Sequence, residues 1–423
     1  MATTTIKKPI FLDDTAQAMN DKQQLIADQI AAQNAILKVM AGSNISAMYS
    51  DFKQLRDLAR TGEADKILSI GDQITVPWVD KSSSANTSYD MPFDIVSFDD
   101  VELQDGETRH GIWLQSHYAT LYGVQFGQAE ALYVATTELP AGTYNFSFKS
   151  GWGTYVKTGV TYQFTLTKAV PAGGQIRGMI QAPDKAPASW RISTYASNTS
   201  TTAIETVTPT EGSDGTSLGV IPYDKAPDTT ATYPLNNIQR VAYGNNRWQN
   251  SAMEQWLNSK AAAGAWWTPR DEYDVPPDQL ATNPGFMSGF SDDFLAVLGK
   301  VKVTTYKNTT AYDGSADVTY DTFFLPALEQ IYANKQIDGE GAYWPYWKEA
   351  LGLTSTSGWY DGNKHEAYKT FALENHASAQ RVRLRSANRG TAYYTWGVNA
   401  GGYVHNGYYA WNASRCAPAC VIC

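Results

Sequence analysis

The sequence predicts an α+β protein in which a helical segment precedes a β-rich region and a mixed C-terminal region. Three observations support this prediction. Apolar residues recur at intervals of three and four near the N-terminus, and this spacing changes to two from about residue 65. Short helical and strand-like patterns alternate after about residue 234. At 423 residues the chain has room for two or three domains, and the predicted divisions are 1–62, 63–235 and 236–423.

Charge balance and hydropathy together exclude two classes of protein. There are 33 basic and 42 acidic residues, a net charge of −9, whereas a nucleic-acid binder needs a basic surface. We therefore expect no nucleic-acid partner. A bilayer-spanning helix needs about 20 apolar residues; the sequence contains no such run, so we expect no membrane insertion. The N-terminus resembles no signal peptide, which predicts synthesis in a reducing cytoplasm.

The N-terminal segment predicts a long helix over residues 13–40, with Asp13 or Asp14 at its start. Its apolar positions follow a heptad pattern typical of a coiled coil; they are Met19, Ile26, Ile30, Leu37 and Met40. Such a stripe needs a partner, which is either the rest of the chain or other copies of it, as in a trimer. A second short helix is expected over residues 46–61.

The middle region predicts antiparallel strands. Residues 67–78 and 93–98 are β-like, and residues 143–149 and 160–167 alternate cleanly enough to pair with each other. The Ser/Thr-rich residues 193–217 are expected to form a long surface loop.

The C-terminal region begins with compact elements. Residues 246–258 predict a helix whose buried face carries Trp248, Ala252, Trp256 and Leu257. A short helix at 294–298 is expected to run into a strand at 301–305.

The last fifty residues carry the strongest signal. After Glu374 the chain contains no Asp, Glu or Lys, yet five arginines remain, and residues 381–386 alternate like a strand. Residues 388–412 mix Tyr and Trp with Asn, His and Gly, a combination that builds recognition surfaces. The same composition would suit a glycine-rich hairpin whose aromatics fill their own core. The residues alone leave both interpretations open.

The other chemistry in the sequence is sparse. Cys416, Cys420 and Cys423 supply three ligands where zinc takes four, so we interpret them as small buried residues near a closing strand. The acids Asp271, Glu272, Asp274 and Asp278 beside Trp266–Trp267 could form a glycosidase pair, but we favour a solvated loop. We therefore expect no enzyme activity, no cofactor and no metal.

A series of motifs in the C-terminal region resembles the phage proteins of gut bacteria that carry a C-type-lectin-like terminal domain, a fold related to formylglycine-generating enzymes. The resemblance covers residues 236–423 and, more loosely, 65–125. The motifs are Trp248, Gln255–Ser259, Pro276–Pro277, Gly285–Phe290, Thr322–Pro326, Leu384–Ser386, Val398–Gly402 and Pro418–Ile422. In several such proteins a diversity-generating retroelement rewrites the terminal segment, here residues 387–415.

The resemblance implies which residues bind ligand and which support them. The expected ligand-binding residues are Tyr393, Tyr394, Tyr403, His405, Asn406, Tyr408, Tyr409, Trp411 and Asn412. The expected core beneath them comprises Leu384, Trp396, Val398, Val404 and Val421. Lectins of this fold hold Ca²⁺ through a Trp-Asn-Asp triplet; here Trp411-Asn412-Ala413 lacks the acid, so we expect no calcium site.

These inferences predict a receptor-binding, host-attachment protein of the phage virion, located at the tail tip. Its ligand would be a host cell-surface protein or glycan, and its N-terminal helix would join tail or baseplate proteins. The alternatives are a carbohydrate-degrading tail enzyme (a glycosidase or depolymerase) and a structural tail component without a ligand.

Overall fold

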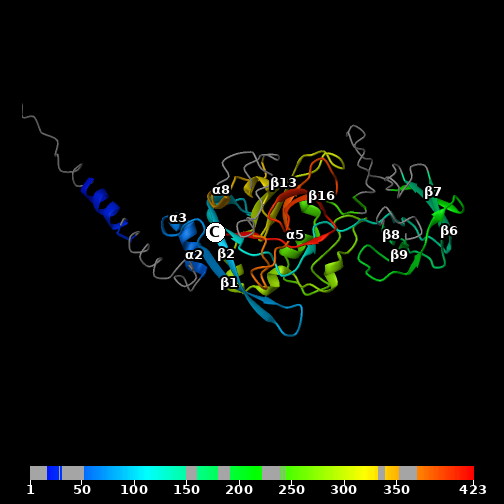
Figure 1. Ribbon diagram of the computed structural model, residues 1–423, viewed down its shortest axis with the longest axis horizontal. Coiled ribbons are helices and arrows are strands. Elements are labelled where there is room, and N and C mark those ends of the chain that lie inside the picture. The colour runs from blue at the N-terminus through cyan, green and yellow to red at the C-terminus, as the bar shows by residue number, and fades with distance from the viewer. Residues whose placement is uncertain are drawn as a thin grey trace, which may run out of the picture.

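The protein is mixed and β-rich, with few helices, and its parts follow one another along a line (Figure 1). The computed structural model describes residues 17–27, 29–30, 52–148, 160–179, 191–221, 240–241, 243–331, 339–351 and 369–423. An isolated N-terminal helix lies at one end, a large body occupies the centre, and a small β-module lies at the other end. None of the helices in the described ranges is long and apolar enough to cross a membrane.

The central body is built on an antiparallel sheet that joins distant parts of the chain. Its strand order is β1-β2-β3-β19, with bounds Gln73–Asp80, Thr87–Glu102, Thr108–Ser116 and Ala419–Ile422. Val421 pairs with Trp113 and Cys420 with Leu114. The closing strand expected around the cysteines is therefore paired with the region that precedes residue 120.

Helices and shorter strands cover this sheet with a large aromatic core. The Ser251 side chain caps α5 by accepting a hydrogen bond from the backbone N–H of Glu254. The helix predicted over 246–258 is divided at Ser251 into the short 3₁₀ turn η3 and α5, and all six residues of α5 are buried. The burial predicted for Trp248, Ala252, Trp256 and Leu257 is confirmed. The helical elements are α2 (Phe52–Thr61), α3 (Ala64–Ile67), η3 (Trp248–Asn250), α5 (Ala252–Leu257), η4 (Asp278–Ala281), η5 (Phe286–Gly289), α6 (Asp292–Leu295), α7 (Leu328–Ile331) and α8 (Pro345–Leu351).

Three smaller sheets complete the body. Strands β13 (Val301–Tyr306) and β14 (Ala316–Asp321) form a hairpin. The terminal sheet has the order β15-β16-β17, with bounds Val382–Ala387, Tyr394–Val398 and Val404–Tyr409. Strand β18 (Ala413–Ser414) pairs with β4 (Val124–Gln125).

The β-module has its own core and consists of two four-stranded sheets. The orders are β10-β9-β8-β5 and β11-β7-β6-β12. The predicted pairing of residues 143–149 with 160–167 is confirmed by the antiparallel β6–β7 register. The strands are β5 (Tyr133–Val134), β6 (Gly142–Phe148), β7 (Thr161–Leu166), β8 (Gln175–Met179), β9 (Arg191–Tyr195), β10 (Glu205–Val207), β11 (Thr210–Glu211) and β12 (Thr216–Ile221).

Two expectations about this region change. The surface loop predicted over residues 193–217 is wrong, since this stretch includes β10 and β11 and parts of β9 and β12. The hydrophobic cores also divide the chain differently from the predicted boundary at 235/236. One core joins Leu55 and Leu114 to Trp248 and Val421, and a second core lies within residues 132–218 and Val241. The β-module is thus inserted into a body formed by residues on both sides of it.

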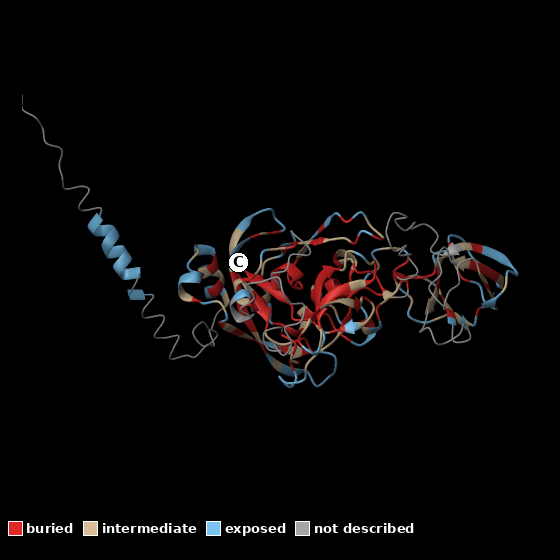
Figure 2. Cartoon of the chain, turned by 45° about the horizontal axis from the view of Figure 1, so that its top comes forward, coloured by how far each residue is buried: buried red, intermediate tan, exposed pale blue. Residues whose placement is uncertain are grey.

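The N-terminal helix contrasts with the body in its exposure (Figure 2). All of residues 17–27 are exposed, and Met19 and Ile26 are 59% and 55% accessible. The heptad stripe therefore has no cover within this chain over the described residues. The remaining heptad positions Leu37 and Met40, together with Met48 of the second predicted helix, lie outside the described residues.

Candidate ligand-binding face

The terminal sheet is attached at the junction between the body and the β-module. Residues 410–411 lie beside the two chain segments that connect the body to the β-module. The backbone N–H of Phe126 donates to Ala410 O (2.9 Å), and that of Trp411 donates to Tyr243 O (2.8 Å). Gly244 has a φ of +82°, and a Cβ there would collide with the carbonyl oxygen of Gly127. This close crossing fixes Trp411 at the junction.

Arg383 donates hydrogen bonds to the backbone of the predicted binding segment. Its side chain lies in β15 and is buried, with the residue 1% exposed. Its guanidinium donates to Tyr408 O (3.4 Å), Tyr409 O (3.1 Å), Asn412 O (3.0 Å), Ser414 Oγ (3.0 Å) and Thr395 Oγ1. Burial lowers the pKa of Arg383 to about 9, which leaves it charged at neutral pH. Backbone carbonyls thus accommodate an arginine in a segment that lacks acids.

The strand register divides the predicted ligand residues between two faces of the terminal sheet. Tyr394 pairs directly with Tyr409, whereas Thr395 pairs with Tyr408. Because successive residues of a strand point to opposite faces, Tyr394 and Tyr409 lie together and Tyr408 lies on the other side. The nine residues therefore do not form one continuous surface.

Four of the nine gather into an aromatic group together with Tyr243, which the sequence did not indicate. We call this group the tyrosine cluster; it comprises Tyr243, Tyr393, Tyr394, Tyr409 and Trp411. Tyr243 stacks on Tyr409 with centroids 3.9 Å apart, and Tyr393 lies 4.4 Å from Tyr394. Trp411 lies 6.4 Å from Tyr243. Tyr393 is buried, and the other four are half-buried, so part of the surface of those four residues is accessible.

The remaining five candidates lie elsewhere. Tyr408 is buried under the Arg381 guanidinium, 5.3 Å from its ring centroid, and His405 lies 5.5 Å from Tyr408. Burial raises the pKa of the Tyr408 hydroxyl. Tyr403, Asn406 and Asn412 are half-buried. The carbonyls of Asn406 and Asn412 accept hydrogen bonds from Asn388 and Arg383, respectively.

The expected core beneath the segment is confirmed. Leu384, Trp396, Val398, Val404 and Val421 are each at most 3% exposed and belong to the body's main core. The three cysteines are free and buried. Burial raises the pKa of the Cys416 thiol to about 12 and that of Cys420 well above its ordinary value, so these side chains pack as neutral groups.

A cavity of about 480 Å³ opens beside Trp411, between the body and the β-module. Its walls include Pro276 and Pro277 from the body and Arg177 and Tyr195 from the module. Flat apolar walls combined with polar groups are typical of small-ligand sites.

Two polar atoms of the cavity's lining residues have no hydrogen-bond partner in the structure. They are Gln128 Oε1, whose residue is 3% exposed, and the indole Nε1 of Trp411. A buried acceptor and a buried donor without partners are costly, so such atoms indicate a missing partner.

Charged residues also line the cavity, among them Arg177 and Glu130. The Arg177 guanidinium lies over the Tyr195 ring (3.8 Å to its centroid) and donates to Ser200 O (2.7 Å). Burial lowers the pKa of Arg177 to about 10. Glu130 pairs with buried Arg240 at 2.8 Å. These partners restrain Arg177 and Glu130, so these two charges have fixed positions in the cavity wall.

The acidic loop beside the cavity is not uniformly solvated. Glu272 and Asp278 are exposed. Asp274, however, is 3% exposed and accepts hydrogen bonds from the backbone N–H groups of Arg270 (2.7 Å) and Asp271 (2.9 Å). Burial raises the pKa of Asp274 to about 6. The solvated-loop interpretation thus fails for Asp274, which stabilises the turn from inside.

The sequence missed Tyr243, Gln128, Arg177 and Tyr195. They lie far from residues 388–412 along the chain, and only the inserted arrangement of the β-module brings them to Trp411. The sequence carried no local signal for this proximity.

Comparison with known proteins gives one family match. Residues 230–422 match the family described as a domain of unknown function, DUF6273. No curated protein and no solved structure matches the chain. The matched range includes the terminal sheet and begins after the β-module, but it leaves out β1, β2 and β3, the strands of the sheet that β19 joins by pairing with β3.

Proposed function

We propose that the protein is a phage receptor-binding protein that presents an aromatic face on a C-type-lectin-like scaffold. The observation that carries the proposal is the half-buried tyrosine cluster, which continues through Trp411 into the wall of the 480 Å³ cavity. A rigid scaffold beneath partly exposed aromatic rings is what a binding surface requires. The Arg383 hydrogen bonds supply that rigidity.

The ligand in this proposal is a host cell-surface protein or glycan. Tyrosine and tryptophan rings pack against either one, and the cavity is lined by both polar and apolar residues, which suits a hydroxyl-bearing group. Diversification by a retroelement would act on residues 387–415, and it requires a reverse-transcriptase gene and a near-copy of this segment nearby.

Attachment and oligomerisation belong to the N-terminal helix in this proposal. Its exposed Met19, Ile26 and Ile30 suit a trimeric coiled coil or a contact with tail or baseplate proteins at the tail tip. Several copies held together would raise a modest single-site affinity.

The proposal is tested by the attachment of fluorescently labelled full-length protein to a panel of gut-bacterial isolates. Trp411→Ala and Tyr409→Ala should each lower attachment by about tenfold or more, since buried aromatic anchors dominate binding. Tyr320→Ala is the matched control, because Tyr320 is also half-buried but lies in β14. Equal attachment by all four proteins would contradict the proposed face.

One observation favours the alternative of a carbohydrate-degrading tail enzyme. Glu130 and Asp278 both line the cavity, and two carboxylates beside aromatic and proline walls are the minimum for glycoside hydrolysis. Sugar release from host capsule that disappears in Glu130→Gln and Asp278→Asn would favour the enzyme. Attachment without release would favour the binding protein.

A further inference from the structure

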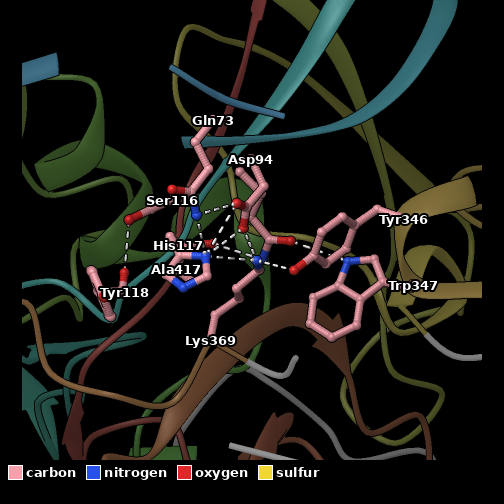
Figure 3. A network of polar contacts seen from close by, with 10 residues as sticks. Gln73, Asp94, Ser116, His117, Tyr118, Tyr346, Trp347, Lys369 and Ala417 are labelled. Atoms are coloured by element: carbon pink, nitrogen blue, oxygen red, sulfur yellow. Dashed lines mark hydrogen bonds and ion pairs between the residues drawn. The ribbon is translucent and has the colours of Figure 1, made fainter. Parts of the chain in front are cut away.

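A buried polar network joins two parts of the body that are distant in sequence (Figure 3). Lys369, immediately before the C-terminal segment, reaches Asp94 in the centre of β2, which lies 275 positions earlier. His117 and Tyr346 flank the pair on opposite sides. Lys369 is fully buried, and Asp94 is 1% exposed.

Three polar side chains lie within hydrogen-bond distance of this pair. Lys369 Nζ is in direct contact with Asp94 Oδ2, and it lies 2.6 Å from the Tyr346 hydroxyl. His117 Nδ1 lies 2.8 Å from Asp94 Oδ2 and 3.5 Å from Lys369 Nζ. Gln73 Nε2 donates to the other carboxylate oxygen, Oδ1, at 3.0 Å.

The surroundings favour an uncharged amine. Complete burial lowers the pKa of Lys369 well below its ordinary value, because the protein interior disfavours an ammonium ion. A neutral amine is a nucleophile, and a neutral carboxyl group is the form that it can attack. The backbone of Lys369 also has a φ of +58°, a left-handed conformation that is seldom adopted by lysine and that clusters at functional sites.

We propose that Lys369 and Asp94 join in an intramolecular amide bond that the folded chain forms by itself. Nζ attacks Cγ of the protonated Asp94 side chain, so the Nζ–Cγ bond forms and the Cγ–Oδ2 bond breaks. One proton leaves Nζ, and the departing hydroxyl takes up one proton and leaves as water. No oxidant or other reactant is consumed.

Each neighbour has a role in this step. His117 Nδ1 is within reach of both Nζ and Oδ2, so it relays the proton from the amine to the leaving oxygen. Gln73 donates to Oδ1, where negative charge develops in the tetrahedral intermediate. The Tyr346 hydroxyl positions Nζ. His117 is the catalytic residue, and Gln73 stabilises the charge.

The bond would tie β2 to the start of the segment that carries β15–β19. It would hold the terminal sheet on the body even if other contacts opened. This role does not depend on what the tyrosine cluster binds, so the two proposals can fail independently.

The test is mass spectrometry of the purified full-length protein. The wild type should be lighter than its sequence by one water molecule, whereas Lys369→Met and Asp94→Ala should have their full sequence masses. Asp94→Asn should lose one ammonia instead of one water. His117→Phe should leave a larger unreacted fraction than the wild type at equal times after synthesis.

A tryptic digest of the wild type decides the matter even if the variants fold poorly. The bond would block cleavage at Lys369 and give a branched peptide that joins residues 82–109 to residues 365–381. Recovery of these segments as separate linear peptides, with an intact mass equal to the sequence, would overturn the proposal.

Discussion

Two aromatic regions of this protein have similar composition but different structure. Around η3, α5 and η5, the rings of Trp248, Trp256 and Phe286 are at most 1% exposed. The tyrosine cluster is half-buried apart from Tyr393. The indole N–H of Trp256 donates to Pro284 O at 2.8 Å, whereas the buried indole nitrogen of Trp411 has no partner among the residues that the structure describes.

The difference separates core rings from partly exposed rings where composition cannot. Trp248 and Trp266 resemble Trp256, since their indole N–H groups also donate hydrogen bonds, to Asp321 (3.0 Å) and to Asn283 O (2.7 Å). Trp267 is an exception, with a buried indole nitrogen that lacks a partner. A satisfied hydrogen bond together with full burial marks a ring that holds the fold. A partly exposed ring, such as that of Trp411, keeps part of its surface outside the core.

The largest expected effect comes from removing a core ring. Trp256→Ala should lower the free energy of unfolding by about 3–5 kcal/mol, because it leaves a cavity and removes a satisfied hydrogen bond. Trp411→Ala should cost about 1 kcal/mol or less, since its ring is only half-buried. Urea unfolding followed by circular dichroism measures both. Similar losses for the two variants would mean that Trp411 is a core residue.

The sequence predicted local structure far better than the arrangement of distant parts. Helical spacing located α5 and its buried face, and alternation located the β6–β7 pair, because both patterns depend on near neighbours. The pairing of β19 with β3 joins residues about 300 positions apart. No periodicity reports such a contact, and the insertion of the β-module was missed for that reason.

The candidate site was predicted in part, for the same reason. Alternation separated core residues such as Trp396 and Val398 from their neighbours. Alternation places Tyr408 and Tyr409 on opposite faces, whereas the bulge between Thr395 and Gly397 shifts the partners of the residues beyond it, and no periodicity in the segment signals that shift. The role of Arg383 was also hidden, because its partners are mostly backbone carbonyls, which any sequence provides.

Replacing Arg383 is expected to have the next largest effect on the free energy of unfolding. It tests whether Arg383 supports the tyrosine cluster. Arg383→Met keeps the apolar stem but leaves the carbonyls of Tyr408, Tyr409 and Asn412 without their donor. We expect a loss of about 2–4 kcal/mol in unfolding free energy and a change in the near-ultraviolet dichroism of the tyrosine cluster. The matched control is Arg381→Met, which removes an exposed arginine two residues away and should cost about 0.5 kcal/mol or less.

A result in which both arginine variants unfold alike would remove Arg383 as the support of the face. A loss of stability without any change in the tyrosine signal would have a narrower meaning. It would mean that Arg383 stabilises the body and not the cluster. The rigidity of the cluster would then come from Tyr243 and from the close approach of Gly244 to Gly127.

The smallest expected effect is on the pH dependence of stability. It distinguishes the aromatic core from the tyrosine cluster, because only the core contains a buried acid pair. The core contains a buried acid pair, Glu254 and Asp321, whereas the chain after Glu374 has no carboxylate side chain. Burial, reinforced by the neighbouring Asp321, raises the pKa of Glu254 from 4.5 to about 8. The folded state therefore binds this proton more tightly than the unfolded state. The resulting stabilisation is complete below pH 4.5 and is lost as the pH rises towards 8.

We expect the wild type to lose about 1–2 kcal/mol of stability across this interval. Glu254→Gln should flatten the dependence, because a glutamine amide can donate to Asp321 at every pH. Glu272→Gln, which changes an exposed glutamate, should leave the dependence as it is in the wild type. Thermal unfolding at a series of pH values measures all three. An unchanged slope in Glu254→Gln would mean that another group binds the proton, and the acid pair could then not be what distinguishes the core from the face.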